Sequence, residues 1–558
     1  MRFATTTISA ALLLALGGSV TAQVEQAAYD YIVAGAGTAG IVAAEQLARS
    51  GRKVLLLERG GPSLYKTGNT AQATKWNSTV TPYDVPALVD SVIQSPNSGW
   101  CDDLSVRAGC LLGGTSVNNG LMFVRPRAAD FGASWPTSWQ WKPDNGIAQA
   151  AADLYEKVPG TILASADGKR YNDEAFDVTS RFLSANGWSE VDALKDVEAK
   201  ELAYTHPVWS IDANGLRDSP ARRHLDAALA QPGFTLELNT KVLRAVRSTS
   251  GSRVEGVEVQ RGDGTRAVIP LSETGALLLA AGTHSTPRVL FNSGIGPESQ
   301  LETVSKGSTN ITLPPREQWL TSLPVGQNLK DHAVATITLT TRPDVALPAL
   351  PATAVTQPDQ ATVDLFAKGS GLLTQASQRL NFWTSVNTTS QQTYSLQGTV
   401  RATLDNTISI KLYLTHGTTS TGTVEITPDG KTNMTTSPLL QTSGDIEALT
   451  AGVDMMLKYA RLPGSILTVP ANVTAESLAA RGKVASGSHH VGTARMGAAD
   501  DGASVVDEDA KVWGVDNLFV VDGSIHPDVP TGNTQAPIMI VANYAARRIL
   551  ALSKAAEA

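Results

Sequence analysis

A short glycine-rich pattern, residues 35–40 (Gly-Ala-Gly-Thr-Ala-Gly), constrains this chain most. It follows a strand-like run at 29–34 and opens an apolar-periodic helical stretch at 41–47, after which a second strand at 53–57 ends at Glu58. In such a βαβ unit the first glycine permits a tight turn, the second lets a pyrophosphate approach the backbone, and the third lets the helix pack on the strand. Glu58 stands where a carboxylate binds ribose hydroxyls. A plain glycine turn is the alternative, but strand, helix and acid in register predict dinucleotide binding.

Length and charge limit the remaining possibilities. The 558 residues exceed what one hydrophobic core supports, which predicts two domains or one composite domain. Hydrophobic residues make up 42% and charged residues 17%, which is typical of a globular chain. The net charge of −7 argues against a nucleic acid or an anionic membrane as a partner.

Residues 1–22 have the pattern of a secretory signal peptide. Arg2 is followed by an apolar stretch at 8–16 and by small residues at 20–22. That stretch is too short to cross a bilayer, and no later segment has ~18 uninterrupted apolar residues. We therefore expect a soluble, extracellular mature protein.

The cysteines and several asparagines suit an extracellular location. Cys101 and Cys110 are the two cysteines of the chain, and in an oxidising compartment a disulfide is their simplest outcome. A metal site needs more ligands than this segment has. Asn-x-Ser/Thr sequons predict surface glycosylation at Asn77, Asn310, Asn387, Asn433 and Asn472.

The glycine pattern does not show whether the dinucleotide is NAD or FAD, but two further motifs favour FAD. Residues 109–116 (Gly-Cys-Leu-Leu-Gly-Gly-Thr-Ser) lead into Asn119, and residues 282–296 begin Gly-Thr-His-Ser-Thr-Pro-Arg and end Ser-Gly-Ile-Gly. They resemble the two signatures of the glucose-methanol-choline (GMC) oxidoreductases, a family of FAD enzymes. Segments 325–332 and 517–522 extend this resemblance over nearly all of the mature chain.

Within that family, the chain looks most like the flavodehydrogenase portion of the cellobiose dehydrogenases. The likeness lies in residues 55–63 (Leu-Leu-Leu-Glu-Arg-Gly-Gly-Pro-Ser), in the cysteine pair, in 380–383 (Leu-Asn-Phe-Trp) and in 530–533 (Pro-Thr-Gly-Asn).

The resemblance implies an α/β fold, with a Rossmann-like FAD-binding domain and a second α+β substrate domain built on an antiparallel sheet. Strand-like runs at 235–238, 254–259 and 276–281 are placed to complete the first sheet, and the alternating run at 408–413 indicates the second. We assign residues 28–130, 210–310 and 490–555 to the FAD-binding domain, and 131–209 and 311–489 to the substrate-binding domain.

The family motifs also imply which residues hold the cofactor. Asn118 stands where some members carry a histidine bonded covalently to the flavin. An amide cannot form that bond, so we predict non-covalent FAD. Val242 stands where the family binds adenine through the backbone. The expected FAD contacts are Gly35, Gly37, Thr38, Ala39, Gly40, Glu58, Gly113, Gly114, Asn118, Asn119, Val242, Asp522 and Thr534.

Alcohol oxidation needs a base for the hydroxyl proton and a hydride acceptor. His489 opens the family motif H-x-V-G-T, and Asn533 occupies its second catalytic position, which is asparagine in the cellobiose dehydrogenases. A neutral imidazole with a pKa near ~6.5 suits the base role at mild pH. A carboxamide cannot be a base, so we expect Asn533 to orient the substrate hydroxyl.

Other residues near these motifs admit two interpretations. Ser488 and His490 flank the base and are candidate substrate contacts, although His490 can equally be structural. Trp383 is either a core residue or a platform for a sugar, and Asp522 is either a helix cap or a flavin contact. His284, His332 and His526 lie beside turn residues or prolines, and we interpret them as local hydrogen-bonding groups.

The leading hypothesis is a secreted FAD-dependent dehydrogenase that oxidises the anomeric C1 hydroxyl of a cello-oligosaccharide or related sugar to a lactone. We expect no haem relay within the chain and therefore a diffusible acceptor such as a quinone. Residues 420–423 (Ser-Thr-Gly-Thr) replace the Ser-Arg-Gly-Arg turn of those enzymes, which leaves an aryl or other small alcohol as an alternative substrate. A non-redox hydroxynitrile lyase or a non-catalytic sugar-binding flavoprotein are alternatives from other classes.

Overall fold

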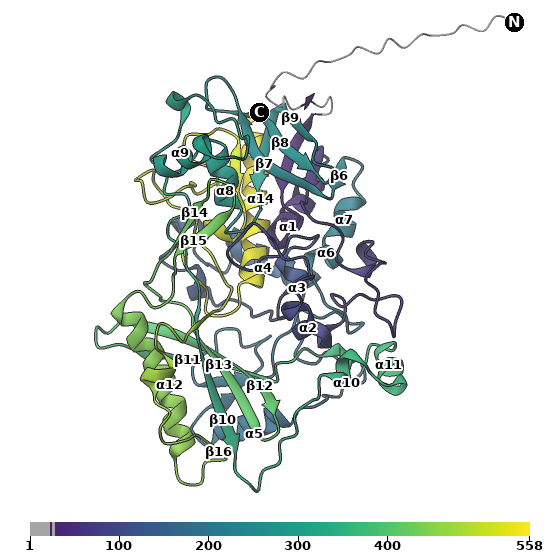
Figure 1. Ribbon diagram of the computed structural model, residues 1–558, viewed down its shortest axis with the longest axis vertical. Helices are drawn as coiled ribbons and strands as arrows, with labels where there is room; N and C mark the ends of the chain where they lie inside the picture. Colours follow the sequence, from purple (N-terminus) through teal and green to yellow (C-terminus); the bar gives the residue numbers. More distant parts are fainter. Residues whose placement is uncertain (1–22, 25–27, 558) are drawn as a thin grey trace, which may run out of the picture.

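The computed structural model describes residues 23–24 and 28–557. The proposed signal peptide at 1–22 lies outside these residues. Among the described residues the chain forms two eight-stranded sheets and a separate two-stranded one. In Figure 1 the first sheet lies in the upper half of the molecule and the second in the lower half.

The glycine pattern lies in a βαβ unit, as the sequence predicts. Strands β2 (Tyr29–Ala34) and β3 (Val54–Leu57) are parallel, and helix α1 (Thr38–Ala48) connects them. Both strands are fully buried at their inner ends, which suits the central strands of a sheet covered on both faces. A Cβ atom at Gly40 would lie 1.8 Å from the Gly35 carbonyl oxygen, so only glycine lets α1 approach the loop this closely.

The first sheet has the strand order β6-β3-β2-β9-β8-β7, with β1 and β18 also paired to β9. The pairs β6–β3, β3–β2, β2–β9 and β9–β18 are parallel, whereas β8 and β7 extend the sheet with antiparallel pairs. The carboxyl ends of the parallel strands therefore share one edge, where the loops after β2 and β3 lie. The remaining bounds are β1 (Gln23–Val24), β6 (Phe234–Glu237), β7 (Thr240–Arg247), β8 (Val254–Arg261), β9 (Arg266–Leu279) and β18 (Leu518–Val520).

A long C-terminal helix, α14 (Gln535–Glu557), packs against α1 beside the first sheet (Figure 1). Helix α4 (Gly146–Lys157) packs on α14 in turn, and its buried residues Ile147, Ala150 and Leu154 belong to the same hydrophobic core. Helix α4 thus packs on the core of the first sheet, although it falls within 131–209, which the sequence analysis assigns to the substrate-binding domain.

A second group of residues also departs from the predicted boundaries. The two-stranded sheet of β14 (Thr423–Ile426) and β15 (Thr432–Thr436) lies within 311–489, yet β14 packs on α8 (Thr286–Asn292) and α9 (Glu298–Lys306) of the FAD-binding part. Ile426 joins the first hydrophobic core, which explains why this hairpin leaves the second domain.

The second sheet has the strand order β16-β10-β13-β12-β11-β5-β4, with β17 paired to β10, and its long strands are antiparallel. Helices α5 (Glu174–Ser184) and α12 (Ser443–Arg461) pack on one face and bury Ile408, Ile410 and Leu412 in a second core. The predicted antiparallel sheet with flanking helices is thereby confirmed. The strands are β4 (Ser189–Glu190), β5 (Ala203–Thr205), β10 (Ala333–Thr341), β11 (Leu380–Asn387), β12 (Thr393–Leu404), β13 (Thr407–Leu414), β16 (Leu467–Thr468) and β17 (Ala485–Ser486).

Short helices fill the connections. The α-helices are α2 (Val89–Gln94), α3 (Thr115–Asn118), α6 (Pro220–Arg223), α7 (Leu225–Leu229), α10 (Thr353–Thr356), α11 (Gln360–Phe366) and α13 (Ala475–Leu478). The 3₁₀ helices are Tyr65–Thr67, Pro86–Leu88, Ala128–Phe131, Thr137–Trp139, Arg316–Gln318, Leu372–Thr374 and Gly523–Ile525. No helix in the described part of the chain is both long enough and apolar enough for a membrane span.

Cys101 and Cys110 form the predicted disulfide, with their Cα atoms 5.1 Å apart. The sequon residues Asn310, Asn387, Asn433 and Asn472 are exposed, and Asn77 is half-buried. Glycosylation at these sites stays a prediction.

Candidate active site

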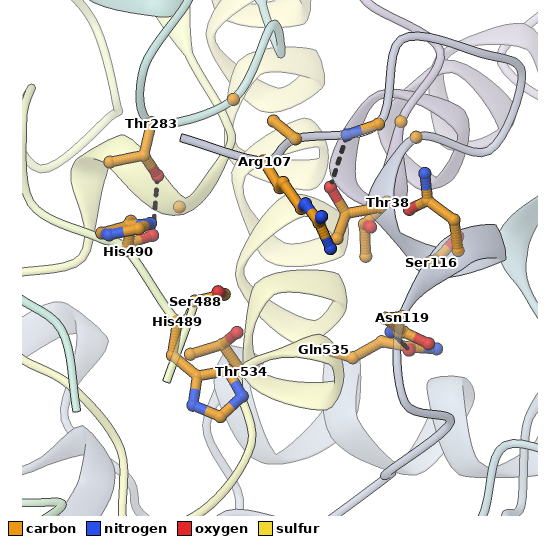
Figure 2. A pocket seen from close by; sticks show the side chains of 18 of the residues that line it. Thr38, Arg107, Ser116, Asn119, Thr283, Ser488, His489, His490, Thr534 and Gln535 are labelled. Carbon is orange, nitrogen blue, oxygen red and sulfur yellow. Dashed lines mark hydrogen bonds between the residues drawn. The ribbon is translucent and has the colours of Figure 1, made fainter. Parts of the chain in front are cut away.

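A cavity of about 650 Å³ is lined by residues from both large sheets. Its wall includes the glycine loop after β2 and the start of α14 on one side, and the strands β10, β12 and β13 on the other. In the view of Figure 2, His489 and Thr534 appear on one side of the cavity and Thr38 and Asn119 on the other. The sequence motifs at both ends of the chain therefore meet in one cavity.

The glycine loop leaves open space on the cavity wall. A Cβ atom at Gly37 would have only the Gly114 Cα atom nearby, at 3.8 Å, and one at Gly282 would meet nothing within 4 Å. Glu58 follows β3 on the same wall, and its carboxylate accepts hydrogen bonds from the amides of Ala36 (3.0 Å) and Gly60 (2.8 Å). Burial raises the pKa of Glu58 to about 7 against the effect of those amides. This loop suits a diphosphate, and Glu58 suits a ribose.

Asn118 and Asn119 lie on the cavity wall at the end of α3. The Asn118 amide nitrogen donates to the carbonyl of Ser98 at 3.1 Å, while its buried Oδ1 has no partner among the described residues. Asn119 donates to Gln535 at 2.7 Å and so connects α3 to the start of α14. An unpartnered buried acceptor beside an open loop fits a bound cofactor with its own donors.

Asp522 is held entirely by donors of the protein. Its Oδ2 accepts from the amide of Gly282 at 2.8 Å and from the hydroxyl of Thr286 at 2.6 Å, and its Oδ1 accepts from the amide of Ser524 at 2.8 Å. The carboxylate thus caps the 3₁₀ helix Gly523–Ile525 and joins it to the Gly282 loop on the cavity wall. Both interpretations of this residue remain compatible with its position.

The other expected cofactor residues divide into two groups. Gly40 and Gly113 are not on the cavity wall: Gly40 lies in the first turn of α1 against the Gly35 carbonyl, and the Gly113 amide donates to the Ala36 carbonyl at 2.8 Å. They position the loops instead. The residues that line the cavity are Gly35, Gly37, Thr38, Ala39, Glu58, Gly114, Asn118, Asn119, Val242, Asp522 and Thr534. Together they fit FAD, as the sequence predicts.

His489 lies at the other end of the same cavity, and a directed series of hydrogen bonds fixes its tautomer. His332 Nε2 lies 3.0 Å from the carbonyl oxygen of Pro530, which can only accept, so this nitrogen carries the proton. Burial lowers the pKa of His332 to about 3, so its Nδ1 keeps a lone pair. That lone pair accepts from His489 Nδ1 at 2.9 Å. His489 Nε2 is therefore left without a proton.

The amide of Asn533 gives the same assignment from the opposite direction. Gln397 donates from Nε2 to Asn533 Oδ1 at 2.9 Å, so Asn533 presents its Nδ2 group to His489. Asn533 Nδ2 lies 2.9 Å from His489 Nε2 and donates to it. Because both ends of the series agree, Nε2 of His489 is an acceptor, as a general base requires.

The loop that carries His489 is held in place by a buried carboxylate. Asp331 Oδ1 accepts from the backbone amides of His332 (2.8 Å) and His489 (2.7 Å), and Asp331 Oδ2 accepts from the hydroxyl of Ser486. Ser488 adopts a φ of +58°, which turns the chain sharply before His489. These contacts fix the imidazole by backbone geometry.

Burial lowers the pKa of His489 to about 4, although Asp331 opposes the shift. The expectation of an ordinary imidazole pKa is therefore wrong. Desolvation disfavours the imidazolium form, so the ring stays neutral over the whole mildly acidic range.

Three residues expected near the substrate have different surroundings. Ser488 lines the cavity and is exposed to it. His490 also lines the cavity, but it lies edge-on to His284 at 4.6 Å and its backbone carbonyl accepts from Thr283. Trp383 is 1% exposed and packs in the first core, so the structure does not bring it to the cavity.

Sequence analysis gave no role in the site to four of its residues, Asp331, His332, Gln397 and Tyr413. The interpretation of His332 as a local hydrogen-bonding group is wrong, because its partners are 157 and 198 residues away in the sequence. Segment 325–332 does match the family, which is the signal that marks its last two residues, Asp331 and His332. Gln397 and Tyr413 follow no motif, and the alternating pattern of their strands only predicts which face they occupy.

The described residues contain no group of acidic, histidine or cysteine side chains that could hold a metal ion.

Comparisons with known proteins agree with this geometry. The dehydrogenase eriK of Hericium erinaceus is 25% identical over 93% of this chain and 93% of its own length, and the pyranose dehydrogenase of Agaricus xanthodermus is 27% identical over 94% and 93%. A formate oxidase variant of Aspergillus oryzae RIB40 superposes with a TM-score of 0.75 at 18% identity, covering 95% of this chain and 99% of that one. The latter similarity shows the shared fold.

Two family profiles, both described as GMC oxidoreductase, match residues 29–334 and 418–542. They cover the glycine loop, the Asn118 region, His489 and Asn533, which are the parts that meet in the cavity. The chain therefore belongs to the GMC oxidoreductase family, FAD-dependent enzymes that act on the CH–OH groups of alcohols and sugars.

Proposed function

We propose that this enzyme oxidises a carbohydrate alcohol, with the anomeric C1 hydroxyl of a cello-oligosaccharide or related sugar as the best candidate and a lactone as product. The observation that carries the proposal is the unprotonated Nε2 of His489, which faces the amide of Asn533 in the cavity. A substrate hydroxyl that displaces this direct contact donates its proton to Nε2 and accepts a hydrogen bond from Asn533 Nδ2.

The reaction balances with the groups in this cavity. The hydroxyl proton goes to His489 Nε2, and the carbon–oxygen bond gains double-bond character as the carbon-bound hydrogen leaves as hydride. Bound FAD supplies the hydride acceptor. Proton transfer to a positioned base contributes ~10²–10⁴-fold to such a rate. Asn533 keeps the hydroxyl oxygen in line with the imidazole throughout.

The character of the substrate wall favours a polyhydroxylated molecule. Several hydroxyl and amide side chains line it beside the cations Arg401 and Lys411, and each hydroxyl or amide can exchange hydrogen bonds with a sugar. The similarity to a pyranose dehydrogenase and the motif resemblance to the cellobiose dehydrogenases support the same substrate class. The polar residues of this wall are Thr336, Ser377, Gln378, Thr399, Ser409 and Ser488.

A diffusible acceptor such as a quinone would reoxidise the reduced cofactor in an extracellular setting. The disulfide at Cys101–Cys110 supports an oxidising compartment, and the exposed sequons support secretion. The family allows oxygen as well, so the acceptor is a separate question from the substrate.

Mixing the enzyme with cellobiose, monosaccharides and aryl alcohols without air tests the proposal. A dehydrogenase bleaches the flavin absorbance in a single turnover, and we expect the sugars to do so fastest. Subsequent addition of a quinone or of oxygen should restore the colour and identify the acceptor. A flavin that stays oxidised with every sugar would contradict the proposed substrate. Cleavage of a cyanohydrin without bleaching would indicate a lyase.

A further inference from the structure

One wall of the cavity carries an excess of positive charge on the second sheet. Strand β13 alternates between the two faces, so Ile408, Ile410 and Leu412 enter the core while Ser409, Lys411 and Tyr413 face the cavity. The neighbouring strand β12 adds Arg401 to the same wall. Arg401 pairs with Ser409 in the ladder and Thr399 pairs with Lys411, so the two cations are diagonal neighbours.

A single carboxylate on this wall compensates one of the two cations. Asp90 accepts from Arg401 Nη1 at 2.8 Å. No carboxylate in the described chain forms an ion pair with Lys411, although burial and Arg401 lower the pKa of its ammonium group and Asp90 opposes them. The other carboxylates on the cavity wall, Glu58 and Asp522, accept hydrogen bonds from the FAD-binding part of the protein. On the wall formed by the second sheet, Lys411 is therefore the cation without a carboxylate partner.

The position of Lys411 relative to His489 sets the size of a ligand that reaches both. The ring of Tyr413 stacks on that of His489 with centroids 5.8 Å apart. Lys411 precedes Tyr413 by two residues on the same face of β13, which places their Cα atoms about 7 Å apart. Tyr413 contacts the base and Lys411 is its next neighbour on this face of β13, so about one ring's width of strand separates the base from the position of Lys411.

The cofactor phosphates do not account for this charge. The loop that suits a diphosphate lies on the first sheet, after β2, whereas Lys411 and Arg401 project from the second sheet. A free cation on the substrate wall, one ring away from the base, suits an anionic group of the substrate itself.

We propose that the preferred substrate is an alcohol or sugar with a carboxylate at the end remote from the oxidised carbon, and that Lys411, assisted by Arg401, binds this carboxylate. The inference rests on the proposed function and narrows its substrate class to acids such as a uronic-acid-containing disaccharide or a hydroxymethyl-benzoate. Arg401 shares its charge with Asp90, so Lys411 makes the larger contribution.

Matched pairs of substrates test this directly in the FAD-loaded enzyme. Cellobiouronic acid is compared with cellobiose, and 4-(hydroxymethyl)benzoate with 4-(hydroxymethyl)benzamide, by anaerobic flavin reduction. We expect the acid of each pair to have the higher kcat/KM and to lose this advantage as ionic strength rises. Lys411→Met should lower kcat/KM for the acids by about 10–100-fold and change the neutral partners by less than about twofold.

Two controls separate a charge effect from a general one. Lys411→Arg keeps the charge and should retain most of the preference for acids. Lys458→Met removes an exposed lysine of α12 and should leave kcat/KM unchanged for every substrate. Equal reduction by acids and neutral partners in the wild-type enzyme, or equal losses for both in Lys411→Met, would overturn the proposal.

Benzoate and benzamide have no carbinol group to oxidise, so their binding tests the anion site separately from the proposed oxidation. A perturbation of the flavin spectrum by benzoate that Lys411→Met weakens about tenfold or more would support the anion site even if no alcohol reduced the flavin. In that case only the proposed oxidation would fail. If benzoate bound no more tightly than benzamide, the proposed anion site would be contradicted, whereas the proposed oxidation would not be affected.

Discussion

At the scale of single residues, the carbonyl of Pro530 determines which nitrogen of His489 can act as a base. This carbonyl accepts a hydrogen bond from Nε2 of His332, which leaves Nδ1 of His332 to accept from Nδ1 of His489. His332→Leu removes the acceptor for His489 Nδ1, so both tautomers become accessible and flavin reduction should slow at least about tenfold. His332→Asn restores a carbonyl acceptor and should recover part of the rate, as measured by anaerobic flavin reduction.

A purely structural role for His332 would give a different pattern. Both substitutions would then lower thermal stability together, and the reduction rate per folded, yellow molecule would stay at the wild-type value. Nitrogen chemical shifts of the His489 ring offer a second readout, because they distinguish a ring protonated at Nδ1 from one protonated at Nε2.

The buried setting of His489 predicts the pH dependence of substrate oxidation. Burial lowers its pKa to about 4, and the charged or titratable groups around the ring are Asp331, His332, His490 and Tyr413. The base is inactive when protonated, so kcat/KM should fall only as the pH drops through about 4 and should stay level from about pH 5 to 8. Stopped-flow reduction across this range checks the prediction. A midpoint near the ordinary value of ~6.5 would mean that the site is wetter than the structure indicates.

Motifs identify the two residues of this site that follow fixed sequence patterns, but they miss those that order them. His489 and Asn533 each stand in a recognisable segment. Gln397 stands in none, and the family-like segment that ends at His332 does not show that this residue contacts His489. The lowered pKa of His489 also depends on burial by both domains, which a sequence pattern does not describe.

At the scale of elements, the turn from β2 into α1 sets how the dinucleotide loop is built. A Cβ atom at Gly40 would overlap the Gly35 carbonyl at 1.8 Å. Gly40→Ala should therefore push α1 away from the loop, lower the stability by about 2 kcal/mol or more, and reduce FAD retention. Gly482→Ala, where a Cβ meets nothing within 4 Å, is the matched control.

The ratio of flavin to protein absorbance after purification, together with a denaturation curve, measures both effects. If Gly40→Ala retained full flavin content and stability, the close approach of α1 would not matter for binding.

Strands were easier to predict than the boundaries between domains. The runs around 254–259 and 276–281 fall in β8 and at the end of β9, where most of their residues are buried. Helix α4 and the β14–β15 hairpin lie in segments assigned to the other domain, and only their tertiary contacts reveal where they pack. The points at which the chain passes from one domain to the other are therefore set by tertiary packing in the two cores, which a sequence pattern does not show.

At the scale of the whole molecule, the cofactor cavity connects the two domains. Its wall combines the glycine loop near the N-terminus, the sheet of β10, β12 and β13, and the start of α14. The cavity is complete only when segments from both domains have packed together. FAD that binds this assembled state should raise the melting temperature, and the rise should grow with the logarithm of its concentration above the dissociation constant.

Non-covalent binding is the corresponding prediction for the cofactor. Asn118 has a carboxamide where covalent members have an imidazole, and its nitrogen already donates to Ser98. Precipitation of the protein with acid should leave all flavin in the supernatant. Added FAD should then restore colour and stability to refolded apoprotein. Flavin that remains on the polypeptide after denaturation would contradict this prediction.

The central claim is that His489 accepts the substrate proton in a cavity shared by both domains. The most direct measurement is anaerobic flavin reduction by the best substrate in His489→Ala, with His206→Gln as a control at a buried histidine outside the cavity. We predict a folded, yellow His489→Ala protein whose flavin reduction is slowed by ~10²–10⁴-fold, and a control close to wild type. Reduction of His489→Ala at the wild-type rate would show that another group takes the proton.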